Sequence, residues 1–517
     1  MRPTFLSFDT AYRALAAAQA QIDVAGNNMS NADTDGYTRQ RVDLNAVTNS
    51  GYNTKYASDV FSGGWGVKAT GISQIRDPFL DARYRNEAAD NGTYGTIVDG
   101  LKDLQRVLDE IDTGGIQTEI SAFIQQLQTF STAPTDTDMA SVVRTAAQKV
   151  TQILNTYANQ IEELRIQEKF DLENVVVNND FNSTVKNIAS LNKQIRDEQL
   201  HGNTPNDLYD QRNYLIDHLS TMANIKVVTS SEKISEDLSI ENLSISIYDE
   251  NSGKSISLIK NGLYNTLNVA EDPNDRRLSI IEIQCSFDAP ADSDITRYLS
   301  NGSIKGYLDL INGQGSYANP ASDENDFRGT LYYANLLDSF ASGFANEFNE
   351  LNKGADITGP DKPLFSATGG GTITADNIQV SDEWLDNPLY ITTTRTSGAS
   401  TPDNIERMIT KPTTDKLTFT DAKGGTAFTG TMSEFLTMMT ADYALDIQLY
   451  ENFEKTSNAV LGQLFEARES VSGVVLDEEG INIMSYQKAY NAAARYFTVL
   501  DEALDTLING MGLVGRG

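Results

Sequence analysis

Apolar residues recur at seven-residue intervals at both ends of this 517-residue chain. The N-terminal series is Phe8, Leu15, Ile22 and Met29, with Ala11, Ala18 and Ala25 three positions after its first three members, and the C-terminal series is Ile483, Tyr490, Phe497, Leu504 and Met511. This is the spacing of a and d positions in a coiled coil, so each end is predicted to form a helix with a narrow apolar seam. Either seam alone would fit an amphipathic helix packed on a core. Because the seams lie at opposite ends of the chain, a paired N- and C-terminal helix is the better interpretation.

The two seams are too small to hold this pair together in isolation. Burying about a dozen large side chains at about 1.5 to 3 kcal/mol each stabilises the pair by some 20 to 35 kcal/mol at most. Ordering roughly 90 residues costs about 1.5 kcal/mol for each of them. We therefore expect the ends to be largely unfolded in the isolated chain and to fold on assembly into a polymer, where neighbouring subunits supply more buried surface.

Proline positions and apolar spacing predict further long helices. Pro134 and Pro205 enclose a proline-free run with apolar residues three and four positions apart, and a second such run extends from Leu445 through Leu464. A shorter helical pattern covers residues 327–351. These segments predict helices that connect the two ends of the chain.

Two segments have the alternating pattern of β-strands. Residues 226–300 alternate apolar and polar side chains, and residues 355–431 contain the Thr-rich stretches GGGTIT, YITTTRT and KLTFTDAKGG. The prediction is an α+β multidomain protein, in which long terminal helices form a coiled-coil-like helical trunk and antiparallel β domains are inserted between them. The predicted parts are an assembly domain (1–45 and 475–517), a helical rod domain (46–225, 320–355 and 435–474), a β domain (226–319) and a second β-rich segment or subdomain (356–434).

Composition argues against several classes of function. The 40 Lys and Arg against 72 Asp and Glu give a net charge of −32, which would repel nucleic acid and anionic lipid. One cysteine and two histidines are too few for a zinc site of the usual Cys/His type. No apolar stretch is long enough to span a membrane, and the N-terminal segment does not have the pattern of a cleaved secretory signal. We expect no nucleic-acid partner, no membrane insertion, no cofactor and no bound metal.

Two acidic motifs are better explained as structural features than as a metal-binding or catalytic site. Residues 31–36, Asn-Ala-Asp-Thr-Asp-Gly, match the opening of a calcium-binding EF-hand loop, but Val42 stands where that loop needs a bidentate Glu. A turn is the better interpretation, with Gly36 at positive φ. Residues 477–479, Asp-Glu-Glu, open the predicted C-terminal helix, where acidic side chains stabilise the helix dipole. The sequence predicts no catalytic residue.

Sequence signatures at both ends point to a family. Gly26-Asn-Asn-Met-Ser-Asn-Ala-Asp-Thr-Asp-Gly36-Tyr37-Thr-Arg39-Gln40 resembles the N-terminal signature of bacterial flagellar axial proteins, the rod, hook and hook-associated subunits. Ser472-Gly473-Val-Val-Leu-Asp477-Glu-Glu479, followed by Tyr486-Gln487-Lys-Ala-Tyr490, resembles their C-terminal signature. The form Gly36-Tyr37-Thr38-Arg39-Gln40 is similar to the hook-associated family of the hook–filament junction.

The resemblance implies a structural subunit without catalytic activity. Such a subunit forms a homo-oligomeric ring between the hook subunits and the second junction protein on the filament side, with paired terminal helices inside and β domains outside. It is extracellular and is exported through the flagellar export apparatus, with an export chaperone and without a cleaved signal peptide. The alternatives are the hook or another axial subunit, a surface adhesin carried on outward β domains, and a hydrolase within a β insertion.

Three residues next to the N-terminal seam are predicted to form part of the subunit interface. Tyr37 offers an apolar face with a polar tip, which suits a subunit boundary. Arg39 and Arg41 lie two positions apart, so on an extended strand they would project to one side and pair with carboxylates of a neighbouring subunit. Solvated arginines that offset local acidic charge are the alternative.

Overall fold

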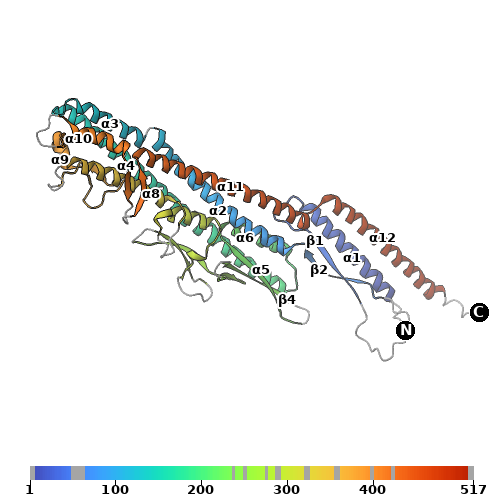
Figure 1. Cartoon of the computed structure of the whole chain (residues 1–517). Coiled ribbons are helices and arrows are strands. Elements are labelled where there is room, and N and C mark those ends of the chain that lie inside the picture. The colour runs from blue at the N-terminus through green and yellow to red at the C-terminus, as the bar shows by residue number, and fades with distance from the viewer. Residues whose placement is uncertain are drawn as a thin grey trace, which may run out of the picture.

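The structure is a computed structural model of the chain. It describes residues 6–47, 64–113, 115–235, 239–248, 253–273, 277–283, 285, 293–318, 326–353, 361–395, 401–420 and 425–510. The molecule is elongated, with a long helical body and a slimmer unit at one end that contains both ends of the chain (Figure 1). We call this end the terminal unit. It consists of α1 (Leu6–Ser30), β1 (Gln40–Ala46), β2 (Val67–Gln74), α12 (Leu476–Asp505) and the short π-helix η6 (Thr506–Gly510).

Long helices run along the body, and those between Pro134 and Pro205 and across Leu445–Leu464 confirm the helices predicted from the proline-free runs. They are α2 (Pro78–Thr113), α3 (Ile116–Ser131), α4 (Thr137–Phe170), α5 (Asn182–Leu200), α6 (Asn206–Met222), α7 (Ser303–Asn312), α8 (Thr330–Asn352) and α11 (Met432–Ser472). A π-helix, η1 (Asp171–Phe181), joins α4 to α5 without a break. Capping residues explain where two of these helices begin: Asp136 caps the N-terminus of α4, and Thr431 with Glu434 forms a capping box at the N-terminus of α11.

Two large apolar cores hold the body together. The first lies at the far end from the terminal unit, where α3, α4, α8 and the start of α11 enclose fully buried aromatic rings. Phe340 packs on Phe419 with ring centroids 5.9 Å apart, and Phe344 packs on Phe348 at 4.9 Å. The second core lies where η1, α5, α6 and α7 cover the β-sheets. Both cores lie within the body and contain no residue of α1 or α12.

The β-strands of residues 225–294 are antiparallel, as predicted for residues 226–300. Two sheets form, in the orders β3-β4-β5-β6 and β7-β8-β9. Their strands are β3 (Ile225–Lys233), β4 (Ser239–Tyr248), β5 (Ser255–Lys260), β6 (Leu263–Tyr264), β7 (Thr266–Glu271), β8 (Leu278–Ile283) and β9 (Ser293–Asp294). Leu243, Ile245 and Ile247 alternate into the second core, because successive side chains of a strand point to opposite faces.

The structure of residues 361–431 differs from the series of short strands that the sequence predicted for residues 355–431. The GGGTIT stretch forms a turn between β10 (Phe365–Ala367) and β11 (Ile378–Val380), because Gly369, Gly370 and Gly371 all have positive φ. The YITTTRT stretch begins at Tyr390, the last residue of η5 (Pro388–Tyr390), which follows α9 (Asp382–Asp386), and it forms no strand in its described part. Of these three Thr-rich stretches, only the third contains a strand: its residues KLTFT include β12 (Leu417–Thr420), which pairs with β13 (Thr426–Gly430).

This segment also contains a helix that the strand pattern did not predict, α10 (Asp403–Thr414), whose apolar side packs into the first core. The fold is α+β, with a helical trunk and inserted antiparallel strands. The division into four domains stays a prediction. Within the described ranges, none of the helices combines the length and the apolar content needed to cross a bilayer.

Candidate assembly site at the terminal helices

The terminal helices pair side by side, as the two seams predicted. α1 packs along α12, and the ring of Phe8 meets the ring of Phe497 edge to face with centroids 5.2 Å apart. The small d-position residues Ala11, Ala18 and Ala25 are all buried. Their short side chains let the two helix backbones approach closely, which explains why small residues occupy one line of the seam.

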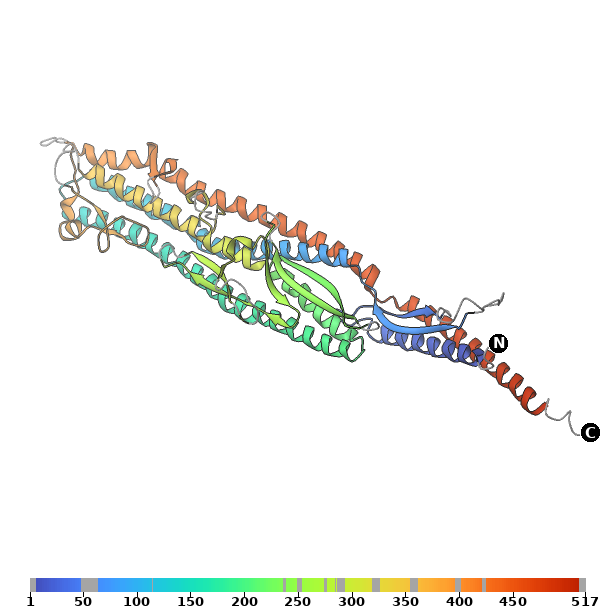
Figure 2. The same cartoon turned by 90° about the horizontal axis from the view of Figure 1, so that it is seen from below.

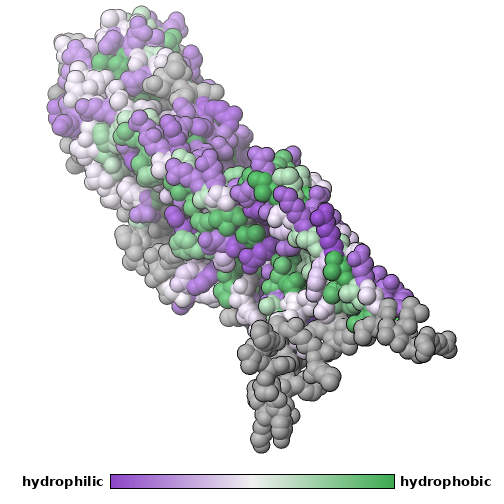
Figure 3. Space-filling model, turned by 90° about the vertical axis from the view of Figure 1, so that its right-hand side faces the viewer, coloured by the Kyte–Doolittle hydropathy of each residue, from purple (hydrophilic) through white to green (hydrophobic). Residues whose placement is uncertain are grey.

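The pair leaves most of its apolar surface uncovered. All residues of α12 are described, and only Glu479 among them is buried. The exposed large apolar residues between positions 475 and 510 are Val475, Leu476, Ile481, Met484, Tyr490, Tyr496, Phe497, Val499, Leu507 and Ile508. Figure 3 looks onto this end of the molecule and shows hydrophobic residues at its surface. One face of α12 is thus covered by α1, and the rest has no cover within the chain.

The predicted seam residues lie in this helix pair with unequal burial. Leu15, Ile22, Ile483 and Leu504 are half-buried, whereas Met29, Tyr490 and Phe497 are exposed. Met511 lies outside the described residues. The larger a-position residues are therefore less buried than the alanines.

Arg39 binds carboxylates of its own chain. Its Nε and Nη2 lie 2.7 Å from Oε1 of Glu479, and its Nη1 lies 3.0 Å from Oε2 of Glu478. Its backbone N–H donates to the carbonyl of Ser472 at 2.9 Å. The first turn of α12 thus supplies carboxylate partners for Arg39 within its own chain, and the pairing of Arg39 with a neighbouring subunit stays a prediction.

Arg41 does not share the environment of Arg39. Strand β1 begins at Gln40, so Arg39 precedes the strand and the alternation that was expected to align the two arginines does not apply. The side chain of Arg41 is 66 % exposed and lies 3.6 Å from Asp43 on the same strand. Its Nε also donates to Oγ of Ser73 at 3.4 Å, and the role of Arg41 in a subunit interface stays a prediction.

Tyr37 lies against the end of α1. Its hydroxyl donates to Oδ1 of Asn28 at 2.9 Å, and Asn28 also binds the backbone N–H of Gln40 at 3.0 Å. Burial, and then the negative charges of Asp210, Asp207 and Glu479, raise the pKa of Tyr37 to about 12. Residues 31–36 form a turn that ends at Gly36 with φ of 76°, as predicted, and no cluster of three or more metal-binding side chains occurs among the described residues.

A polar joint connects the terminal unit to the body. We use this name for Gln74, Arg76, Asp81, Asn206 and Asp210. Gln74 donates from Nε2 to Asp210 at 2.8 Å and to the carbonyl of Asn206 at 3.0 Å, while Arg76 pairs with Asp81 at 2.8 Å. Hydrogen bonds to buried charged groups depend strongly on geometry, so these contacts fix the orientation of the terminal unit.

Asp210 lies at the centre of this joint. Burial raises its pKa to about 6, against hydrogen bonds from Thr38 and the charge of Arg76, which lower it. Its Oδ2 is buried without a hydrogen-bond partner. The carboxylate of Asp210 is therefore the part of the joint that is most costly to keep charged.

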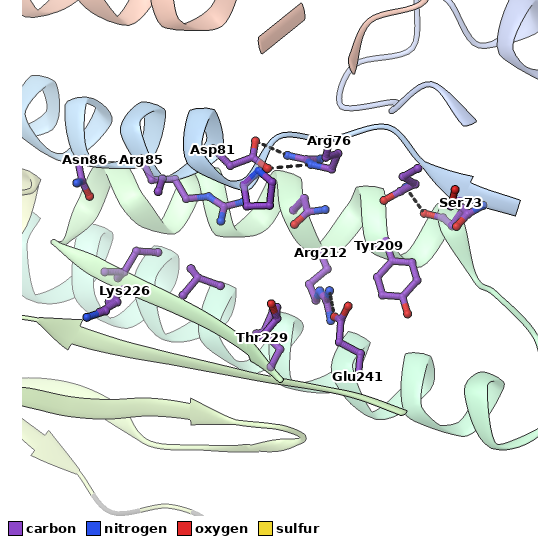
Figure 4. A pocket seen from close by; sticks show the side chains of 18 of the residues that line it. Ser73, Arg76, Asp81, Arg85, Asn86, Tyr209, Arg212, Lys226, Thr229 and Glu241 are labelled. Atoms are coloured by element: carbon purple, nitrogen blue, oxygen red, sulfur yellow. Dashed lines mark hydrogen bonds and ion pairs between the residues drawn. The ribbon is translucent and has the colours of Figure 1, made fainter. Parts of the chain in front are cut away.

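A cleft of about 1260 Å³ opens beside the joint, between α2, α6, the β1–β2 hairpin and β3 (Figure 4). Its three arginines already have partners: Arg76 binds Asp81, Arg85 binds Asp217 at 2.7 Å, and Arg212 binds Glu241 at 2.6 Å. Paired arginines hold helices and strands together and leave little charge for a ligand. The cleft is consistent with a structural role for these side chains.

Sequence reasoning missed the residues that join the terminal unit to the body. Glu478 and Glu479 were interpreted only as acids of a first helical turn, whereas they also bind Arg39. Gln74, Asn206 and Asp210 belong to no periodic pattern, because contacts at a joint depend on how two units meet. The only signal available was Asn206-Asp207-Leu-Tyr-Asp210, a polar start to a helix.

Comparisons with known proteins give consistent results. Residues 101–365 match the family model of the flagellar hook-associated protein FlgK helical domain, and residues 8–38 match that of the flagella basal body rod protein. The chain is 30 % identical over 524 residues, covering 100 % of both chains, to flagellar hook-associated protein 1 of Bacillus subtilis. It is 23 % identical to the protein of that name from Escherichia coli, over 97 % of this chain and 99 % of the relative. The solved structure of the flagellar hook junction protein FlgK from Burkholderia pseudomallei aligns with 56 % of this chain and 47 % of its own, at 21 % identity and a TM-score of 0.43.

Proposed function

The chain belongs to the family of flagellar hook-associated protein 1, and from this premise we propose that it is a structural subunit of the hook–filament junction. The family consists of structural flagellar proteins, so the chain is a flagellar component. In the proposed role it forms a homo-oligomeric ring at the tip of the hook and carries out no catalysis. It contacts hook subunits on one side and a second junction protein and the filament on the other.

The observation that carries this proposal is the uncovered apolar surface of α12. A helix of 30 residues with a single buried side chain has too little cover to be stable in water. Contiguous apolar patches on a protein surface mark sites of protein association. In the proposed ring, neighbouring copies and hook subunits cover α12, and the paired terminal helices are the elements through which the subunits polymerise.

Export and location follow from the same role. We propose that the chain leaves the cell through the flagellar export apparatus with the help of an export chaperone and functions in the extracellular part of the flagellum. We expect the terminal unit to fold only on assembly. Its helices are then not yet formed when the chain passes through a narrow export channel, so export does not have to unfold them.

A binding experiment with isolated hooks tests the proposal. Purified chain is added to hooks that lack junction proteins, and immunogold electron microscopy locates it. We expect labelling at one end of each hook and no growth of long tubes. Long tubes formed by the chain alone would identify a hook-type subunit and contradict the junction role.

Substitutions in the seams make the test specific. Phe497→Asp places a carboxylate in the apolar contact with Phe8, at a cost of several kcal/mol in each subunit, so binding to the hook should be lost. Leu15→Asp should act in the same way. Leu389→Asp is the matched control, because Leu389 lies in the body and is 38 % exposed, against 37 % for Phe497. If all three variants bound equally well, the terminal helices would not be the assembly site.

A further inference from the structure

Helix α11 also carries exposed apolar residues within the body. Leu445 is 61 % exposed and Leu449 is 46 % exposed. They belong to a line of exposed, uncharged residues at helical spacing, which we call the α11 stripe: Ala441, Leu445, Gln448, Leu449, Asn452 and Thr456. In a chain of net charge −32, an uncharged exposed stripe is unusual. Loss of charged residues and gain of apolar ones is the composition of an interface core.

A second group of exposed apolar residues lies on the helix that runs from α4 into η1. Ile166 and Phe170 are each 55 % exposed, and Val175 is 50 % exposed. They lie four and five positions apart, which brings them to one side of a helix that widens from α to π geometry at Asp171. We call these three residues the α4 stripe.

Both stripes lie at the same level along the body, beside one short stretch of α2. Lys102 of α2 binds Glu451 of α11 at 2.9 Å. α2 also contacts α4, and the charges of Asp103 and Asp99 of α2 add to burial in raising the pKa of Glu168 of α4. Leu449 is two residues from Glu451, and Phe170 is two residues from Glu168. The two stripes are therefore not displaced from each other along the long axis.

Each stripe points away from the interior of the body. Residues two positions apart in an α-helix lie about 160° apart around its axis. Ile166 and Phe170 are thus on the side of α4 opposite to Glu168, which is buried in the body. Gln448 and Asn452 are likewise opposite to Tyr450, whose ring lies 6.4 Å from that of Tyr94 on α2.

The stripes also lie on different sides of the body. α11 contacts α2 through Tyr94 and Lys102, and α4 contacts α2 as well. Figure 2 shows α11 along one long edge of the body and the continuous helix of α4, η1 and α5 along the opposite edge. Each molecule therefore presents two different uncharged apolar stripes on its two edges.

We propose that the α11 stripe of one subunit packs against the α4 stripe of the next copy of this chain. The proposal rests on the proposed function, because it assumes a homo-oligomeric ring. Two different faces at one level and on opposite edges are what a heterologous contact requires, and such contacts close into a ring when the rotation between subunits allows it.

Cysteine cross-linking in assembled flagella tests the contact. The single native cysteine is removed with Cys285→Ser, and Leu449→Cys and Phe170→Cys are introduced together into the full chain. The variant is made in flagellated cells as their only copy, and intact hook–filament structures are treated with a short bis-maleimide. Each subunit then links to two neighbours. We expect a ladder of oligomers on a denaturing gel, ending at the number of subunits in the ring.

Two controls separate this arrangement from others. Either cysteine alone should give only monomers, because neither residue lies opposite its own copy in a heterologous contact; dimers from Leu449→Cys alone would overturn the proposal in favour of a two-fold contact. Asn458→Cys with Phe170→Cys should also give monomers. Asn458 is exposed on α11 and lies nine residues from Leu449, about 180° around the helix.

A second measurement does not depend on cross-linking distance. Leu445→Glu with Leu449→Glu adds carboxylates to the α11 stripe of an acidic protein, so the amount of chain retained at hook tips should fall at least tenfold. Leu263→Glu, at a residue of β6 with 47 % exposure, should leave retention unchanged. Normal retention of the double variant together with no ladder would overturn the proposal while leaving the junction role intact. Absence of the Cys285→Ser parent from hook tips would instead contradict the proposed function.

Discussion

The guanidinium group of Arg39 lies 2.7 Å from Oε1 of Glu479, a residue 440 positions further along the chain. The side chain of Glu479 is only 4 % exposed, and that of Arg39 is 19 % exposed. With the bond from the Arg39 N–H to the carbonyl of Ser472, this pair ties the start of β1 to the break between α11 and α12. It holds the two ends of the chain together where they leave the body.

Reversing the charge of Arg39 should release the terminal unit. Arg39→Glu leaves three carboxylates together, one of them buried, and removing one partner of a buried ion pair costs about 3 kcal/mol or more. We expect binding to isolated hooks to fall about a hundredfold, measured by quantitative immunogold labelling. The double variant Arg39→Glu with Glu479→Arg should recover part of this loss.

Arg41→Glu is the matched control for this prediction. Its side chain is largely exposed and lies close to Asp43 and Ser73, so its contribution is below about 1 kcal/mol. Equal losses for Arg39→Glu and Arg41→Glu would contradict the role assigned to the Arg39–Glu479 pair.

Periodic features of the sequence predicted the elements well. The heptad spacing of Ala11, Ala18 and Ala25 predicted that these residues share one buried face of a helix, and all three are buried in α1. The alternation of Leu243, Ile245 and Ile247 predicted a strand with one buried face, which β4 confirms. Such patterns succeed because the geometry of a single helix or strand determines which residues share a face.

Contacts between elements could not be predicted in this way. The contact of Arg39 with the first turn of α12 depends on the residue at which β1 begins. A shift of that start by one residue changes the side of the strand to which an arginine points. The polar joint is set by the angle between the terminal unit and the body, about which local spacing carries no information. In residues 369–374, strand-forming threonine and isoleucine follow three glycines whose left-handed backbone makes a turn instead.

The terminal unit should exchange its amide hydrogens faster than the body in the isolated chain. The apolar cores of the body include no residue of α1 or α12, and most of α12 is exposed. Helices without tertiary cover open with little cost in free energy. Hydrogen-exchange mass spectrometry on the monomer should show low protection in residues 6–47 and 476–510 and high protection in α4 and α8. Strong protection of both ends in a monodisperse monomer would contradict folding on assembly.

The stability of the body should fall as the pH rises through about 7. Burial, and then the charges of Asp103, Asp171 and Asp99, raise the pKa of Glu168 from 4.5 to about 7. Because the folded-state pKa is above the unfolded one, the stabilising effect is complete below about pH 4.5 and is lost as the pH rises through 7. This rise in pKa corresponds to at most about 3 kcal/mol, less where solvent reaches the group.

Glu168→Gln isolates this effect. The variant should be more stable than the unsubstituted chain at pH 8 and should depend less on pH between 5 and 8, as measured by urea unfolding of the body. Glu163→Gln, at an exposed position of the same helix, should leave the pH dependence unchanged. A pH profile that is the same for Glu168→Gln and the unsubstituted chain would show that this carboxyl group titrates normally.

Close packing between α2 and the end of α6 gives a prediction about the core of the body. A Cβ atom added to Gly92 would lie 2.1 Å from the carbonyl oxygen of Thr221, a backbone atom that cannot move independently, whereas a Cβ at Gly95 would meet nothing within 4 Å. Gly92→Ala should therefore force the helices apart and lower the free energy of unfolding by about 1 to 3 kcal/mol. Gly95→Ala lies on the same helix and should instead raise it by up to about 1 kcal/mol, because alanine favours the helical backbone. Urea unfolding of the two variants measures both changes, and a destabilisation of equal size in both would mean that the helices do not approach as closely as the structure places them.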